Sequence, residues 1–270
     1  MSEIVCGNCL DIIKTIPEKS VDLICTSPPY AEQRKELYAS ISEEDYPNWT
    51  VEWMNECARV LKDSGSVAIV IRPHISHGQI SDYVLKTRLA VRKSGWLECE
   101  ELIWIKPNSP PLGSISRPRR SWESILWFSR SSNPFCNPKA NGTPSDRIGL
   151  ESKKGVGKYK SGVSTAKTGI ARCRDYVEVG TSGVDRSKEN THPALFPQKL
   201  AEWIVRLLSP ENGIVLDPFV GSGTTAVACA VLQRNYIGID ISQEYCEYAQ
   251  KRLDLAKNEI FERSLYKFEV

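Results

Sequence analysis

The sequence predicts an α/β protein built on a largely parallel sheet, and three observations support this class. Short apolar runs typical of buried strands alternate with amphipathic runs typical of helices, which is the pattern of a parallel sheet covered by helices. One strand-like run leads through a glycine-rich turn into a helix. The 270 residues, 41% of them hydrophobic, suffice for one large domain with its own core.

The N-terminal part begins with a strand-like run, Glu3 to Cys6, and an amphipathic stretch, Cys9 to Ile16. Val21 to Thr26 has the composition of a buried strand. It must turn at Ser27-Pro28-Pro29-Tyr30, because consecutive prolines do not continue a central strand. Apolar residues at helical spacing follow over residues 50–62, so we expect a helix there.

The middle of the chain continues the alternation. We expect a strand from Val67 to Ile71, a helix from Gln79 to Lys93, and strands over Leu97 to Lys106 and Glu123 to Ser129. A Pro/Ser-rich break over Pro107 to Ser116 separates the last two.

The stretch from Ser131 to Asn190 has a different character. Gly, Ser, Lys, Arg and Pro dominate it and hydrophobic periodicity disappears, so we expect an irregular segment, which at this length is usually functional or mobile. The whole chain carries a net charge of +2, yet Arg117 to Asn190 contains 15 Lys/Arg against 7 Asp/Glu. Such a local excess suggests a face that binds a polyanion, although a solvated loop region has the same composition.

Alternation returns in the C-terminal part. Helices are expected over Gln198 to Leu208, Gly223 to Leu232 and Gln243 to Lys257, and strands over Gly213 to Leu216 and Tyr236 to Ile239. No internal repeat is visible in the sequence.

The run from Asp217 to Thr225 is the glycine turn between a strand and a helix. Glycines let the backbone approach a ligand closely, and the helix N-terminus offers free N–H groups. Asp240 lies 17 residues beyond Gly223, at the end of the following strand, where an acid can bind ribose hydroxyls. An ordinary tight turn has the same glycines, and the spacing does not choose between NAD and S-adenosylmethionine. A P-loop is excluded, because no Gly-Lys-Ser/Thr follows.

The Ser27-Pro28-Pro29-Tyr30 turn lies where ligands bind in open α/β sheets, beyond the carboxyl end of a strand. The Ser27 hydroxyl and the Pro28 carbonyl are suited to accept hydrogen bonds from one amino group, and Tyr30 is suited to stack on a planar ring. An exocyclic amino nitrogen of a base is a poor nucleophile, because its lone pair is delocalised into the ring. Two acceptors can draw it toward a tetrahedral form, and holding both reactants in line supplies on the order of 7–11 kcal/mol. A strand terminator without chemistry remains the alternative.

The nine cysteines are scattered and odd in number, which is typical of reduced intracellular thiols. Cys6 and Cys9 form a Cys-x-x-Cys pair, but no second pair at similar spacing exists, so we expect no metal site. No signal peptide is recognisable, and no apolar run approaches the length of about 18 residues that a membrane span needs. We therefore expect a soluble cytoplasmic protein that makes no membrane contact.

Together the two motifs resemble those of the beta group of amino-methylating DNA methyltransferases of restriction-modification type. In that group the (D/S)-P-P-Y motif lies near the N-terminus, F-x-G-x-G lies near the C-terminus, and a target-recognition region lies between them. Further matches are Gly7 to Asp11, Ile103 to Lys106, Trp122 to Leu126, and Thr191 to Leu200. Matches occur across most of residues 4–253 and leave only 131–190 without one. The resemblance implies a Rossmann-like, seven-stranded S-adenosylmethionine-dependent methyltransferase sheet with an inserted target-recognition region.

Three parts follow from this resemblance: a catalytic half over 1–130, a target-recognition region over 131–190 and a cofactor-binding half over 191–270. The implied catalytic residues are Ser27, Pro28, Pro29 and Tyr30. The implied cofactor-binding residues are Asn8, Cys9, Thr26, His192, Asp217, Phe219, Gly221, Ser222, Gly223, Thr224 and Asp240. The expected DNA-binding residues are Arg117, Arg119, Arg120, Lys153, Lys154, Lys158, Lys160, Arg172 and Arg174.

The implied substrate is a base flipped out of double-stranded DNA. Because the motif begins with Ser27, which the family associates with cytosine, we expect N4-methylcytosine as product; adenine N6 methylation by the same residues is the nearest alternative. A cytosine carbon-5 enzyme is disfavoured, since the chain has no Pro-Cys dipeptide. A protein or RNA methyltransferase, a non-catalytic DNA-binding protein and a nicotinamide-dependent dehydrogenase are more distant alternatives. A cognate restriction endonuclease is a candidate partner, and the chain is expected to act as a monomer or a homodimer.

Overall fold

The protein is described by a computed structural model that covers residues 2–32, 41–109, 116–145, 169–181 and 197–266. Its helices are α1 (Cys9–Thr15), α2 (Tyr46–Val60), α3 (Tyr83–Lys93), α4 (Gln198–Leu208), α5 (Thr224–Val231) and α6 (Gln243–Tyr266). Its strands are β1 (Glu3–Cys6), β2 (Val21–Thr26), β3 (Leu61–Ile71), β4 (Ile75–Ser76), β5 (Gln79–Ile80), β6 (Leu97–Ile105), β7 (Trp122–Ser129), β8 (Tyr176–Glu178), β9 (Ile214–Asp217) and β10 (Asn235–Asp240). Within these ranges, none of the helices combines the length and hydrophobicity that a membrane span requires.

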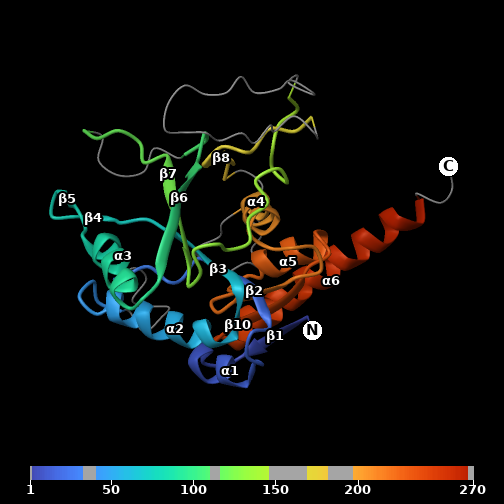
Figure 1. Cartoon of the computed structure of the whole chain (residues 1–270), viewed down its shortest axis with the longest axis horizontal. Helices are drawn as coiled ribbons and strands as arrows, with labels where there is room; N and C mark the ends of the chain where they lie inside the picture. Colours follow the sequence, from blue (N-terminus) through green and yellow to red (C-terminus); the bar gives the residue numbers. More distant parts are fainter. Residues whose placement is uncertain (1, 33–40, 110–115, 146–168, 182–196, 267–270) are drawn as a thin grey trace.

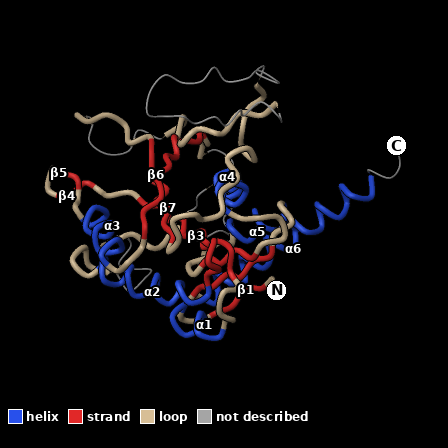
Figure 2. Tube along the Cα trace, in the orientation of Figure 1, coloured by secondary structure: helices blue, strands red, loops and turns tan. Residues whose placement is uncertain are grey.

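One sheet of eight strands organises the described chain, in the order β1-β10-β9-β2-β3-β7-β6-β8. β1, β10, β9, β2 and β3 are parallel, β7 is antiparallel to both β3 and β6, and β8 is parallel to β6. The strands from the two ends of the chain are therefore interleaved in its parallel part. Figures 1 and 2 show the sheet at the centre of the molecule with helices on either side.

Each face of the sheet carries its own apolar core. On one face, strand residues pack against α1, α2 and α3, with Trp53, Met54 and Tyr83 fully buried. On the other face, strand residues pack against α4, α5 and α6, with Ile204 and Leu253 fully buried. The central strands are covered on both faces, which explains why β2 is a continuous buried run rather than an alternating one.

The carboxyl ends of the parallel strands meet at one edge of the sheet. Thr26, Asp217 and Asp240 are the last residues of β2, β9 and β10. Because β7 runs in the opposite direction, it begins at this same edge, where Trp122 pairs with Ile105 at the end of β6. Side chains from both halves of the sequence are thus brought to one edge.

The structure departs from the expected elements in three places. Gln79 and Ile80 form a small hairpin with β4 instead of opening a helix, because Gly78 turns the chain with φ +81°. α2 passes into β3 without a loop. The stretch expected to be irregular contributes β8, so the sheet has eight strands where the resemblance implied seven.

Candidate active site at the carboxyl edge of the sheet

The glycine turn after β9 is shaped by its backbone. Gly221 and Gly223 have φ of +50° and +81°, in the left-handed region that favours glycine. A Cβ added at Gly223 would lie 2.7 Å from the Cβ of Ala249, so α6 leaves no room for a side chain there. Asp217 Oδ1 accepts a hydrogen bond from the N–H of Phe219 at 3.1 Å, which fixes the start of the turn.

Asp240 closes this turn from the neighbouring strand. Its Oδ2 accepts from the N–H of Gly221 at 3.0 Å and its Oδ1 from the N–H of Ser242 at 2.9 Å. Burial raises the pKa of Asp240, and these backbone donors oppose the shift. Each carboxylate oxygen accepts more than one hydrogen bond, so the group can still take a ribose hydroxyl. The glycine turn, the helix N-terminus behind it and this acid fit a nucleoside cofactor.

Asp217 is the most deeply buried acid of the site, with 3% of its surface exposed. Thr26 Oγ1 donates to its Oδ1 at 2.6 Å across the β2–β9 boundary. Burial raises the pKa of Asp217 to about 6, although hydrogen bonds from Thr26, Thr225 and the backbone oppose the rise. The carboxyl lies between the two motifs and links them.

The N-terminal lead-in lies beside the same turn, because the N–H of Gly7 donates to the carbonyl of Asp240 at 2.9 Å. Asn8 caps α1 by accepting from the N–H of Leu10 at 2.9 Å. Burial raises the pKa of the Cys9 thiol to about 11, so it stays neutral near pH 7. The structure thus places Asn8 and Cys9 directly after a residue that is bonded to Asp240; their binding to the cofactor stays a prediction.

Two further predicted cofactor residues, Ser222 and Thr224, are buried. Arg252 of α6 donates to the carbonyl and hydroxyl of Ser222 at 2.6 and 3.2 Å, and to the hydroxyl of Thr224 at 3.3 Å. Their side chains therefore hold α5 to α6 in this structure. His192 lies outside the described residues.

A cluster of aromatic side chains packs against the glycine turn. The Phe219 ring lies 5.3 Å from Trp49 and 5.5 Å from Trp53, both on α2. Tyr46, one turn earlier, packs on Trp49 at 5.2 Å. The sequence predicts a helix over residues 50–62, which begins after Tyr46 and Trp49, and it does not predict this contact, because the spacing of apolar residues on a helix does not reveal which turn the helix covers.

The Ser27–Tyr30 turn follows β2 at the same edge. Pro28 is buried, while Ser27, Pro29 and Tyr30 are half-buried. Tyr30 donates its hydroxyl to Glu123 Oε2 at 3.0 Å. Burial raises the pKa of Tyr30 well above its usual range, and a hydrogen bond from the Ser27 hydroxyl opposes that rise. The hydroxyl of Tyr30 therefore connects the motif to a carboxylate on β7.

Glu123 is one of three charged residues here that the sequence prediction did not assign to the site. It is 7% exposed, and its Oε1 accepts a hydrogen bond from Lys106 and lies 3.8 Å from Arg72 Nε. These residues follow β3 and β6 or begin β7. The sequence shows that these charged residues lie near strand ends. Only the antiparallel direction of β7 reveals that they meet at one edge of the sheet.

One cluster of potential metal ligands lies nearby. Ligand atoms of Glu32, Glu43 and His74 lie within 4.8 Å of one another. His74 Nε2 contacts Glu43 Oε1 directly at 2.6 Å. Two ligands that each lie about 2.1 Å from one ion are farther apart than this, so His74 and Glu43 contact each other directly in this structure rather than through an ion.

The predicted DNA-binding residues fall into two groups. Arg117, Arg119 and Arg120 precede β7 at the active-site edge, where Arg120 donates to the carbonyl of Pro73. Arg172 and Arg174 are exposed before β8. Both groups lie toward the β6–β7–β8 end of the sheet. Lys153, Lys154, Lys158 and Lys160 lie outside the described residues.

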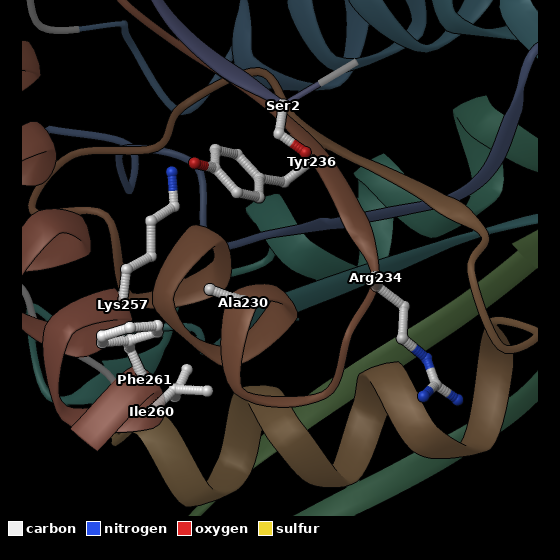
Figure 3. Close-up of a pocket in the computed structure, with 7 residues that line it drawn as sticks. All are labelled: Ser2, Ala230, Arg234, Tyr236, Lys257, Ile260 and Phe261. Atoms are coloured by element: carbon white, nitrogen blue, oxygen red, sulfur yellow. The ribbon is translucent and has the colours of Figure 1, made fainter. Parts of the chain in front are cut away.

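A separate pocket of about 370 Å³ lies away from this site. Ser2, Arg234, Tyr236, Lys257 and Phe261 are among its lining residues (Figure 3). Ser2 precedes β1, while Arg234 and Tyr236 flank the first residue of β10, so the pocket lies at the amino edge of the sheet. None of the predicted site residues lines it.

Known proteins resemble this chain in sequence and in fold. The family model described as DNA methylase, of the N6/N4 methyltransferase type, matches residues 21–251. The type II methyltransferase M.HpaI of Haemophilus parainfluenzae is 30% identical over 93% of this chain and 74% of its own length. Two solved structures have folds similar to that of this chain. PvuII DNA methyltransferase (cytosine-N4-specific) has a TM-score of 0.72 at 22% identity, covering 92% of this chain and 85% of its own. A putative DNA modification methylase from Thermus thermophilus, in complex with S-adenosyl-L-methionine, has a TM-score of 0.65 at 23% identity, covering 95% and 96%.

Proposed function

The chain belongs to the N6/N4 DNA methylase family, and from this premise we propose that it transfers the methyl group of S-adenosylmethionine to the N4 amino group of cytosine in duplex DNA. The observation that carries the choice of base is Ser27 at the head of the Ser-Pro-Pro-Tyr motif. The fold likeness to PvuII DNA methyltransferase, which is cytosine-N4-specific, supports the same choice. Adenine N6 is the competing target, and the same side chains would serve it.

The cofactor, when bound, supplies an electrophilic methyl group on a positively charged sulfur. The turn through Gly221 and Gly223 provides close backbone approach, and Asp240 accepts ribose hydroxyls. The N–H groups at the start of α5 face the same region. The fold likeness to a methylase solved with S-adenosyl-L-methionine supports this assignment.

The target base enters the site flipped from the duplex, at a cost of a few kcal/mol. Ser27 Oγ and the carbonyl of Pro28 accept the two amino hydrogens, and the Tyr30 ring stacks on the base. This arrangement draws the nitrogen lone pair out of conjugation and directs it at the methyl group. Arg117, Arg119 and Arg120 hold the DNA backbone beside the opening.

The test is incubation of the purified protein with unmethylated DNA and isotopically labelled S-adenosylmethionine, followed by digestion to nucleosides and mass spectrometry. We expect labelled N4-methylcytosine. Labelled N6-methyladenine would overturn the choice of base while keeping the mechanism. Absence of label from DNA would overturn the proposed function.

A further inference from the structure

The hydroxyl of Tyr30 is engaged by the protein itself. It donates a hydrogen bond to Glu123 Oε2 at 3.0 Å, and Glu123 is the second residue of β7. A tyrosine side chain turns about two bonds, and a directional hydrogen bond at the far end of the ring restricts both. The bond therefore ties the ring that closes the Ser-Pro-Pro-Tyr motif to the sheet.

Glu123 is itself held in place through its other oxygen. Lys106 donates a hydrogen bond to Oε1, and Arg72 Nε lies 3.8 Å from the same atom. The residue is only 7% exposed, and a carboxylate buried to this extent needs such partners. Both oxygens of the acceptor are thus engaged, one by the cations and one by Tyr30.

Lys106 is in turn supported from the sheet. Its Nζ lies 4.1 Å from the centre of the Trp104 ring, within the range of a cation–π contact. Trp104 is buried, and its Nε1 donates to the carbonyl of Val179 at 2.8 Å. The support of Tyr30 therefore consists of successive contacts between side chains at the ends of β6 and β7, each fixed by a further partner.

Methyl transfer gives a reason for holding this ring. In the proposed function, the Tyr30 ring stacks on the flipped base while Ser27 and Pro28 accept its amino hydrogens. Contacts to DNA phosphates hold the duplex but do not orient a base that has left it. The angle of the ring therefore sets the direction in which the amino nitrogen faces the methyl group, and a displacement of about 1 Å can slow such a reaction by about 100-fold.

We propose that Glu123 is a positioning residue, which with Lys106 holds the Tyr30 ring at the angle needed for methyl transfer. Glu123 acts through Tyr30 and touches neither the base nor the cofactor. Because the Tyr30 hydroxyl is used in this contact, Tyr30 contributes to base binding by stacking alone. The role rests on the proposed function.

The role is tested by the single-turnover rate constant of methyl transfer at saturating cofactor and DNA. Tyr30→Phe keeps the ring and removes the hydroxyl, and Glu123→Leu removes the acceptor. We expect each to lower the rate constant by about 10-fold, because the ring loses its orientation. Affinities for S-adenosylmethionine and DNA should stay within about twofold, since the glycine turn and the phosphate contacts are unchanged. Loss of affinity as large as the loss of rate would overturn the role.

Glu123→Gln separates this role from a general need for a carboxylate. The amide of glutamine is able to accept from the Tyr30 hydroxyl or to donate to it, so the rate constant should stay within about threefold of the wild-type value. The double variant Tyr30→Phe/Glu123→Leu should be no slower than the slower single variant, because both changes break the same contact. A glutamine variant as slow as the leucine variant would overturn positioning through Tyr30.

Glu101→Leu is the matched control. Glu101 pairs with Arg88 at 2.9 Å and accepts from Ser124 at 2.7 Å, so its replacement leaves the bond between Tyr30 and Glu123 in place and should not change the rate constant. If Glu123→Leu folds poorly, Tyr30→Phe still decides, because it keeps the pair of Glu123 and Lys106. An active wild-type enzyme with Tyr30→Phe within about threefold of its rate would overturn the role alone. A wild-type protein that labels no DNA would overturn the proposed function and the role with it.

Discussion

The two halves of the candidate site are built in opposite ways. The cofactor turn is made of backbone: from Asp217 to Asp240, one strand–turn–helix–strand unit supplies its glycines and acids. The proposed site of methyl transfer, which we call the methyl-transfer edge, comprises the Ser27–Tyr30 turn and the charged residues beside it. It is made of side chains from separate strand ends, and Tyr30, Lys106 and Glu123 meet there although they span 93 residues of sequence. The first half depends on space and backbone conformation, whereas the second depends on charge and hydrogen bonding. Substitutions in the two halves should therefore impair different properties, namely cofactor affinity in the first and the rate of methyl transfer in the second.

The largest effect is expected at the methyl-transfer edge. Ser27→Ala and Tyr30→Ala should each lower the transfer rate constant by about 10³-fold, because amino-group acceptors and base stacking are lost. Cofactor affinity, measured by calorimetry, should be unchanged, since the glycine turn is intact. Ser20→Ala, at the other end of β2, loses only a bond to the carbonyl of Pro17 and should keep full activity. Loss of cofactor binding in Ser27→Ala or Tyr30→Ala would contradict the independence of the two halves of the site.

At the cofactor turn, we expect substitutions to impair cofactor binding through steric overlap. Gly223→Ala forces a Cβ to within 2.7 Å of Ala249 Cβ at φ +81°, and we expect about 100-fold weaker S-adenosylmethionine binding in calorimetry. Gly78→Ala is its control, because Gly78 has the same φ but nothing within 4 Å of an added Cβ. It should cost only the backbone strain, about 1–3 kcal/mol of unfolding free energy, and leave binding unchanged. Equal loss of binding in both would show that backbone strain, not contact with α6, is decisive.

Asp217 connects the two halves and should show a cost in stability. Burial raises its pKa to about 6, so the ionised form destabilises the fold. This destabilisation is complete above about pH 6 and absent below about pH 4, which is the pKa of the group in the unfolded chain. Asp217→Asn should therefore raise the unfolding free energy at pH 8 by about 2 kcal/mol. The gain should disappear as the pH falls toward 4, which denaturant titrations at several pH values will measure.

Asp22→Asn gives the opposite expectation on a neighbouring strand. Asp22 is also buried, but it pairs with Lys62 at 2.8 Å and accepts from the N–H of Ile214 at 2.9 Å. Its replacement should lower stability at pH 8. The same sign of change in both variants would contradict the inference that ionised Asp217 destabilises the fold.

The smallest effect is expected at the β8 end. Arg172 is exposed, and Arg172→Ala should weaken DNA binding a few-fold and reduce the slope of log affinity against log salt by about 0.9. Lys86→Ala on α3, where Lys86 lies 3.9 Å from Asp82, should leave that slope unchanged. Fluorescence anisotropy across a salt series measures both. An unchanged slope for Arg172→Ala would remove this end of the sheet from the DNA interface.

The same contrast explains what the sequence could predict. The glycine turn and Asp240 are recognisable because their function is encoded in local spacing. The roles of Lys106 and Glu123 could not be predicted, because they depend on β7 running antiparallel to β3 and β6. The sequence predicts a helix start at Gln79 where the structure has a hairpin, since the four paired residues of this hairpin leave no periodic signal. β8 was missed because three residues that pair with β6 carry too little pattern.

The interleaved strand order has a consequence for how the chain is made. β2 pairs on one side with β3, but its other partner is β9, so Ile24 has no neighbour on that side until Leu216 has been made. At about 5–20 residues synthesised per second, β2 spends on the order of ten seconds or more beside an unfilled position in the sheet. During that time a hydrophobic strand with unpaired backbone groups is open to other chains. Nascent or C-terminally truncated forms should therefore be the ones that chaperones bind and that aggregate, while the finished protein closes this position itself.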